Sequence, residues 1–425
     1  MASSSTTNIS FKESEFVNSV SGDEETKRAA FVRHMVRWLC TFSGEDIESF
    51  EICLSKPMGF ETEIIALIEF VVSRKVKNFV LDFSDPSWTA IHEAQEEAEA
   101  SVFQLPECVY SEATTLESLK LFACGFDQSK FPLQGSLKRL CFGWTQLGKI
   151  MALLSKSPLL ESLSLHHCWN IDMEEAVTET HNPLRELVFQ NCDFATEYST
   201  LDLPNIQIFK YTGSVHCFQF MRVNRIMEEV YLEFDKETEQ DEATATILCG
   251  LLYDLLSARK LTVCPFLIQA IKHSEDPVRL QAAMETNHLV IRSSVKEDDF
   301  VGVRFMVNSC PDLHTLTFEL VPPGPAASTT AVGFDPATFW LYGSSHGCLR
   351  NTLKVVEVRN FNGDTYVFQV LMYLMRWGLV MERLDFYLPS GVDEDHKAWA
   401  RYAATKVRNE FAASSNVLQV YLHNG

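Results

Sequence analysis

The sequence predicts an α/β solenoid in which parallel strands line a concave side and helices lie on the convex side. Three observations predict this fold class. A short apolar motif recurs at a spacing of about 20 to 29 residues, and segments of helical periodicity fall between its copies. The chain has 425 residues, of which 46% are hydrophobic and 22% charged, enough for a large buried core.

The recurring motif is L-x-x-L-x-L, often followed by a cysteine. Its strongest copies start 21, 23 and 24 residues apart, at Leu116, Leu137, Leu160 and Leu184. Weaker copies start at Ile47, Val76, Ile206, Met227, Leu313, Leu353 and Met381, and irregular ones lie near Leu261, Leu289 and Val420. This spacing is typical of leucine-rich repeats.

Each motif is interpreted as a short strand whose alternate residues point into the protein. A single unit is too small to bury that apolar face, so neighbouring units must stack to close a continuous core. Cys124, Cys168 and Cys192 follow three of the strands. We interpret them as small side chains that contact backbone groups at the bend, rather than as redox or metal-binding residues.

Helical periodicity occupies the longer intervals between the strands. The expected helices are Glu61 to Arg74, Gly148 to Lys156, Ala243 to Ser257, Asp299 to Asn308, Thr365 to Trp377 and Asp395 to Phe411. The intervals 76–116 and 313–353 are about 40 residues long, so each must hold an insertion.

Composition and charge exclude several classes of function. The net charge of -21 disfavours a nucleic-acid partner, and no stretch of about 18 apolar residues is present to span a membrane. The 12 cysteines form neither a CxxC pair nor a Cys/His cluster, so no metal or other cofactor is expected. The N-terminus lacks the features of a secretory signal, and we expect a location in the cytoplasm or nucleus.

Catalysis is not expected either. Gly343 to Gly347 matches G-x-S-x-G with Ser345 as a nominal hydrolase nucleophile, but that motif requires a preceding strand and a following helix. Here a Pro/Gly-rich loop precedes it. His166 and His167 are adjacent, and because neighbouring residues of a strand point to opposite sides, the pair is a poor metal site.

The order of segments resembles the plant F-box/LRR-repeat proteins that carry an FBD region. Ser157 to Leu165 followed by Cys168 is similar to that family's "CPLLExLxLxxC" repeat, and Leu201 to Ile206 is similar to its "IxAPNL" segment. The region from Leu349 to Leu388 resembles the FBD region, and Phe31 to Ser55 resembles the linker that follows the F-box.

The resemblance implies a non-catalytic protein-binding scaffold, like the substrate-recognition part of a ubiquitin-ligase adaptor. Residues 1–26 are expected to be a disordered tail, residues 27–348 the solenoid with an N-terminal helical linker or cap, and residues 349–425 FBD-like repeats with a cap helix. Met1 to Lys27 contains no recognisable F-box, so binding to a Skp-type adaptor is not expected.

The repeat register identifies 33 positions on the concave side, in eleven units. They include seven basic and six acidic residues, a net charge of +1 in a chain of charge -21. The basic ones are Lys120, Arg139, Lys210, Lys260, Arg292, Arg359 and Arg383, and the acidic ones are Glu186, Glu229, Glu233, Glu319, Glu357 and Asp385.

We expect a protein partner to bind this concave side at the four strongest repeats, where the strand register is clearest. The candidate binding residues are Lys120, Arg139, Trp144, His166, Gln190, Lys210 and Tyr231, since aromatic and Arg side chains are common interface anchors. Two alternatives stay open. Trp144 could pack on a neighbouring turn while the basic residues pair with Glu186 and Glu229, or the concave side could hold a small ligand.

Overall fold

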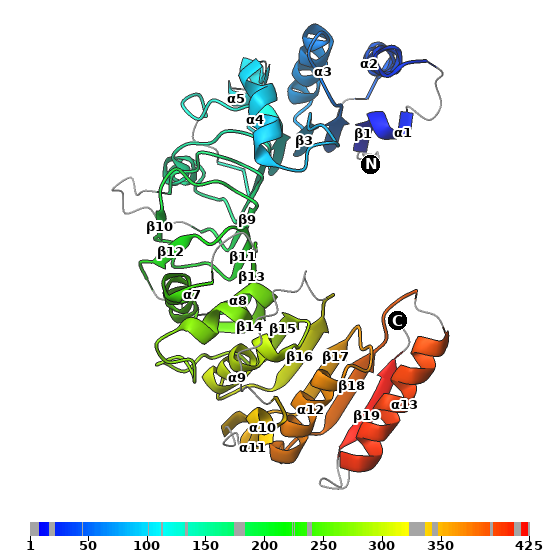
Figure 1. The fold of residues 1–425 in the computed structure, drawn as a ribbon. Coiled ribbons are helices and arrows are strands. Elements are labelled where there is room, and N and C mark those ends of the chain that lie inside the picture. The colour runs from blue at the N-terminus through cyan, green and yellow to red at the C-terminus, as the bar shows by residue number, and fades with distance from the viewer. Residues whose placement is uncertain are drawn as a thin grey trace, which may run out of the picture. The chain divides into compact units, whose positions relative to one another are not determined.

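Two units of parallel strands make up the protein (Figure 1). The computed structural model describes residues 8–16, 22–44, 46–100, 102–111, 114–131, 135–173, 183–222, 224, 226–235, 240–322, 336–341, 347–391, 394–411 and 418–423. Contacts divide the chain into Met1–Ile206 and Gln207–Gly425, called here the first and second units. Each is described by itself.

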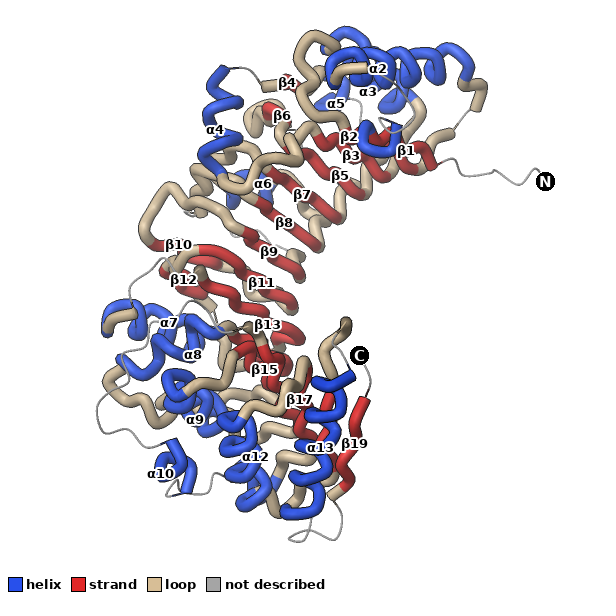
Figure 2. The backbone as a smooth tube through the Cα atoms, turned by 45° about the vertical axis from the view of Figure 1, so that its right-hand side comes forward, coloured by secondary structure: helices blue, strands red, loops and turns tan. Residues whose placement is uncertain are grey.

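The first unit pairs its main strands in chain order. They are β1 (Asn8–Lys12), β2 (Ser49–Cys53), β3 (Asn78–Asp82), β5 (Ser118–Phe122), β7 (Arg139–Gly143), β8 (Ser162–His166) and β9 (Glu186–Gln190). Short strands β4 (Phe103–Gln104) and β6 (Cys124–Gly125) pair separately, and β10 spans Tyr198–Leu201. The helices, several on one side of the strands (Figure 2), are α1 (Glu13–Phe16), α2 (Glu24–Thr41), α3 (Glu61–Ser73), α4 (Ile91–Ala100), α5 (Glu107–Ser111) and α6 (Ile150–Ser155).

The second unit repeats the arrangement. Its strands are β11 (Ile208–Gly213), β13 (Met227–Phe234), β14 (Ala258–Val263), β15 (His288–Ser293), β16 (Thr315–Leu320), β17 (Val355–Arg359), β18 (Arg383–Tyr387) and β19 (Gln419–His423), with β12 at Cys217–Phe220. The helices are α7 (Glu242–Asp254), α8 (Pro265–Ala270), α9 (Phe300–Ser309), α10 (Pro336–Leu341), α11 (Gly347–Asn351), α12 (Thr365–Trp377) and α13 (Glu394–Phe411).

The predicted α/β repeat architecture is confirmed. All six expected helices are present, each within two residues at its start and three at its end, and the irregular copies near Leu261, Leu289 and Val420 are also strands. Strands β16 and β17 pair from Thr315↔Val355 onward. The repeats therefore continue through residue 348, where the sequence analysis expects a boundary.

Residues 8–16 differ from the disordered tail expected there. Strand β1 pairs in register with β2, and its alternate residues Ile9 and Phe11 are buried. The Glu13 carboxylate then accepts hydrogen bonds from the backbone N–H and hydroxyl of Ser55, at 2.9 and 2.8 Å. The Ser/Thr-rich composition conceals this two-residue alternation, which adds one more strand to the sheet.

Alternation along each strand separates the core from the solvent. In β8, Leu163 and Leu165 are fully buried, whereas Ser162, Ser164 and His166 are partly exposed. Fully burying one leucine side chain stabilises a fold by roughly 1.5–3 kcal/mol. Since that burial comes from adjacent repeats, stacking holds each unit together.

The bends after four strands of the first unit each use a left-handed residue. Ala123, Trp144, His167 and Asn191 follow β5, β7, β8 and β9, with φ between 49° and 53°. The next residue is Cys124, Thr145, Cys168 or Cys192, and each bonds a backbone carbonyl, as with the Thr145 hydroxyl, which donates to the Cys124 carbonyl at 2.8 Å. The three cysteines thus occupy the structural positions expected from the sequence.

We predict that Thr145→Val destabilises the protein by about 1–3 kcal/mol, because the buried Cys124 carbonyl loses its donor. The free energy of unfolding in urea measures the effect. Thr145→Ser keeps the hydroxyl and should unfold nearly as the parent does. Equal stability of the Val and parent proteins would contradict the role given to this hydrogen bond.

His216 makes stability depend on pH. Burial lowers the pKa of this imidazole from 6.5 to about 4. The unfolded chain takes up a proton below pH 6.5 while the folded chain does not until about pH 4, so the stabilising contribution present above pH 6.5 is lost as the pH falls through that window. Unfolding curves of parent and His216→Gln should therefore diverge between these pH values, whereas parallel pH profiles would show that His216 is not responsible.

Candidate functional site

Side chains that point away from the core form an open face on each unit. In the first unit, register places them in three rows across neighbouring strands, represented on β8 by Ser162, Ser164 and His166. This is the surface on which the sequence analysis places the partner.

Four of the predicted residues lie on the open face of the first unit. Lys120 is on β5, Arg139 on β7, His166 on β8 and Gln190 on β9. His166 and Gln190 are register partners, and the His166 Nδ1 to Gln190 Oε1 distance is 2.7 Å. Lys120, Arg139 and Gln190 are exposed, while His166 is partly buried.

Trp144 does not lie on a strand. It follows β7, and its ring stacks on that of His167 with centroids 4.0 Å apart and an interplanar angle of 4°. The geometry matches the alternative in which Trp144 packs on a neighbouring turn. His166 contacts Gln190 whereas His167 stacks on Trp144, so the two neighbouring imidazoles have different partners. Burial of His167, and to a smaller extent the charge of His166, lowers the pKa of His167.

Lys210 and Tyr231 lie on the open face of the second unit. They are register partners on β11 and β13. The Lys210 ammonium is 3.8 Å from the Glu229 carboxylate, and the Tyr231 hydroxyl accepts a hydrogen bond from Arg292 at 2.7 Å. Both predicted residues therefore already have partners within their own unit.

Ion pairs run across this face of the second unit. Each basic residue that the repeat register assigns to it contacts a carboxylate: Lys210 and Lys260 contact Glu229, Arg292 contacts Glu233 and Glu319, Arg359 contacts Glu357, and Arg383 contacts Asp385. Such partly exposed pairs are worth about 0–1 kcal/mol each. Their main effect here is to balance charge along the strands.

Two cations on the open face of the first unit lack such an ion pair. Neither Lys120 nor Arg139 forms an ion pair with any carboxylate among the described residues. Arg139 Nη2 donates to Asn78 Oδ1 at 3.4 Å, and Glu186 accepts a hydrogen bond from the Ser162 hydroxyl at 2.7 Å. The sequence analysis left open that the basic residues pair with Glu186. Among the described residues, no ion pair with Glu186 forms on this face.

Phe122 lies on the same open face as these cations, although the sequence analysis did not select it as a binding residue. It lies two residues beyond Lys120 on β5 and opposite Gly143 in register. A Cβ atom at residue 143 would overlap the Phe122 ring, so glycine allows the ring to lie over the β7 backbone. The centroid of the ring is 6.2 Å from that of His166. The sequence did contain a signal for this residue: Phe122 occupies the strand position that faces Gly143 in the next repeat.

Thiols on this face are poorly suited to nucleophilic chemistry. Burial raises the pKa of Cys141 to about 11 and that of Cys53 to about 12, so both remain protonated near neutral pH. Within the described residues, no cluster of three His, Cys, Asp or Glu side chains could hold a metal ion. Ser345 lies outside the described residues.

None of the helices in the described part of the chain combines the length and apolar character that crossing a membrane requires.

We predict that Gly143→Ala forces the Phe122 ring out of position and destabilises the first unit by about 1–3 kcal/mol, as overpacking does. In a Phe122→Ala background the same Gly143→Ala change should cost little, since the obstructing ring is absent. A double-mutant cycle of unfolding free energies measures this coupling. Additive effects would contradict the packing of Phe122 over Gly143.

Comparison with known proteins gives the family. No protein-family profile matches the chain. F-box protein At3g62230 of Arabidopsis thaliana is 43% identical over 417 residues, which cover 98% of this chain and 89% of the relative. Putative F-box/LRR-repeat protein At5g54820 of the same plant is 40% identical over 404 residues, covering 92% and 84%. With this similarity along nearly its whole length and its parallel repeat sheet, the chain belongs to the plant F-box/LRR-repeat family.

Proposed function

We propose that the protein is a non-catalytic scaffold that binds a protein partner on the open face of its first unit. In this role it would serve as the substrate-recognition part of an F-box/LRR-type ubiquitin-ligase adaptor. The names of its relatives support the adaptor role. The choice of surface is supported by a single contrast: the open-face cations that the repeat register assigns to the second unit all form ion pairs, whereas Lys120 and Arg139 in the first unit form none among the described residues.

The binding surface centres on Lys120, Phe122, Arg139 and His166. Lys120 and Phe122 project from the same side of β5, Arg139 lies beside them on β7, and His166 lies beyond Gly143 on β8. Arg and aromatic side chains bury much area from one rigid group, which makes them frequent sources of binding energy. Gln190 extends the surface through its contact with His166.

Charge indicates the chemistry of the partner. Lys120 and Arg139 share their face with Asp82 and Glu186 but form no ion pair with either, so both cations are available to carboxylates of a partner. A partner with acidic side chains beside an apolar group would satisfy both the cations and Phe122. Lys210 and Tyr231 contribute less in this proposal, since their polar groups are already engaged.

A photo-crosslinking amino acid placed at residue 120 of the full chain identifies the partner directly. The control carries the same group at Lys130, an exposed lysine that contacts Glu107 and is not on the open face. A protein that is captured at residue 120 but not at residue 130, and then binds the purified chain, would support the proposal. Capture only from residue 130 would contradict it.

With that purified partner, Lys120→Ala and Arg139→Ala should each weaken binding by about 1–3 kcal/mol, or roughly 5- to 150-fold, with little change in thermal unfolding. Isothermal titration calorimetry measures the loss. Lys130→Ala and Arg33→Ala are the matched controls, because both side chains are exposed elsewhere on the first unit. Normal affinity in both open-face variants would place the binding site elsewhere.

A further inference from the structure

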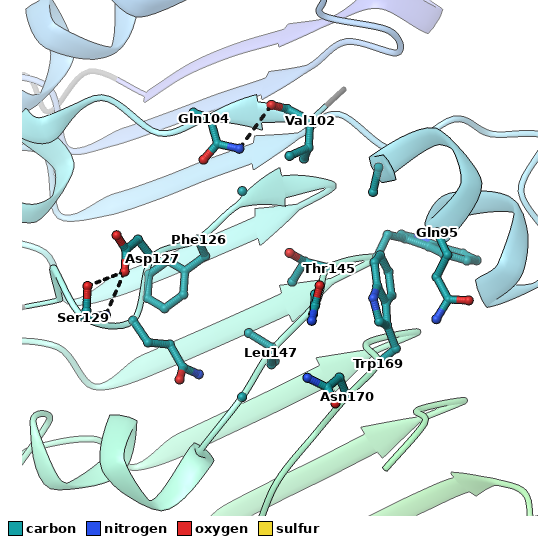
Figure 3. Close-up of a pocket in the computed structure, with 16 residues that line it drawn as sticks. Gln95, Val102, Gln104, Phe126, Asp127, Ser129, Thr145, Leu147, Trp169 and Asn170 are labelled. Carbon is teal, nitrogen blue, oxygen red and sulfur yellow. Dashed lines mark hydrogen bonds between the residues drawn. The ribbon is translucent and has the colours of Figure 1, made fainter. Parts of the chain in front are cut away.

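A cavity with a mixed polar and apolar lining lies at the ends of the strands in the first unit, apart from the residues of the proposed partner site. Its volume is about 1070 Å³. Five segments line it: α4, the β4 strand, the loop after β6, the bend after β7 and the bend after β8. Figure 3 shows Asp127 and Ser129 on one side, Gln95 and Trp169 on the other, and Thr145 and Leu147 between them.

Carboxamides are the most frequent polar groups in the lining. Five of the sixteen lining residues carry one: Gln95, Gln104, Gln128, Gln146 and Asn170. Each carboxamide offers two N–H donors and a carbonyl acceptor. Three of them, Gln104, Gln146 and Asn170, are exposed, so their groups are accessible from solvent.

Two of these carboxamides have unusual surroundings. The amide group of the exposed Gln104 side chain lies close against Gly125. Gln104 Nε2 has only a long hydrogen bond, 3.4 Å to the Val102 carbonyl. The Nε2 atom of Gln128 is buried and has no hydrogen-bond partner among the described residues.

Indole rings supply the apolar part of the cavity. Trp144 and Trp169 both line it, and Phe126 contributes a third aromatic ring. Trp169 is buried and Trp144 is partly exposed. His167 covers one face of the Trp144 ring, so the apolar surface left open to the cavity is the exposed part of Trp144, beside Phe126 and a small part of Trp169. Groups that donate and accept hydrogen bonds surround this surface.

The lining disfavours anionic and purely apolar ligands. It contains no Lys, Arg or His, and its one carboxylate, Asp127, would repel anions. Hydrogen bonds from Ser129 lower the pKa of Asp127, whose Oδ1 already accepts both the Ser129 backbone N–H and hydroxyl at 2.9 and 2.6 Å. A purely apolar ligand would displace water from the carboxamides without replacing its hydrogen bonds.

We propose that this cavity binds a neutral saccharide, whose hydroxyl groups pair with the carboxamides and whose C–H faces pack on the tryptophan rings. Hydroxyl groups match carboxamides because both donate and accept hydrogen bonds. The saccharide could be free or attached to a glycoprotein, and the chemistry of recognition is the same. The proposal does not depend on the protein-binding role of the open face.

The test applies the full chain to an array of neutral and acidic oligosaccharides, followed by calorimetry with the best neutral one. Neutral sugars should bind and acidic ones should bind less. Trp144 and Trp169 are two of the seven tryptophans, so binding should also change the intrinsic fluorescence. A glycoprotein, compared with the same protein after enzymatic removal of its glycan, then distinguishes a free from an attached saccharide.

Gln104→Ala combined with Gln146→Ala should weaken saccharide binding at least tenfold. Asn205→Ala is the matched control, because Asn205 is an exposed carboxamide of the same unit that belongs neither to the cavity nor to the proposed partner site. Thermal unfolding confirms that each variant is folded. Failure of every neutral saccharide and glycoprotein to bind at millimolar concentration would overturn the proposal, as would stronger binding of acidic sugars or unchanged affinity in the double variant.

Discussion

In-register pairing between consecutive repeats is the constraint on which the rest of the structure depends. No repeat can bury Leu163 or Leu165 by itself, so each strand needs its neighbours at one fixed offset. A shift by a single residue would exchange the core and solvent sides of a strand. After β5, β7, β8 and β9, a left-handed residue and the carbonyl hydrogen bond that follows it fix the same offset at the bend.

The same constraint sets what each open face can present. Because alternate residues stand in rows, the charge of a row depends on which residue types recur at one repeat position. In the second unit opposite charges meet on adjacent or nearby strands, as Lys260 does with Glu229. In the first unit the neighbours of Lys120 in its row are Val80 and Cys141, which cannot balance its charge. One scaffold thus carries two faces of different chemistry.

Period and register could be read from the sequence, and with them the strands, the helices and the positions of Lys120, Arg139, His166 and Gln190. Local spacing determines these features. Contacts that depend on side-chain reach were not predictable, because Arg139 extends to Asn78 across an intervening strand and Phe122 lies over Gly143 only since a Cβ is missing there. Trp144 was misplaced because its position in the motif belongs to the bend rather than to the strand.

Stability alone does not account for the difference between the two open faces. An exposed cation stays hydrated when it lacks a partner, and an exposed ion pair adds only about 0–1 kcal/mol, so the fold tolerates either arrangement. A bound partner changes that balance. Once water is excluded, a cation without an internal carboxylate gains from an acidic group on the partner, whereas a cation already paired must first give up its own contact. Lys120 and Arg139 are in the first situation, and Lys210 and Arg292 are in the second.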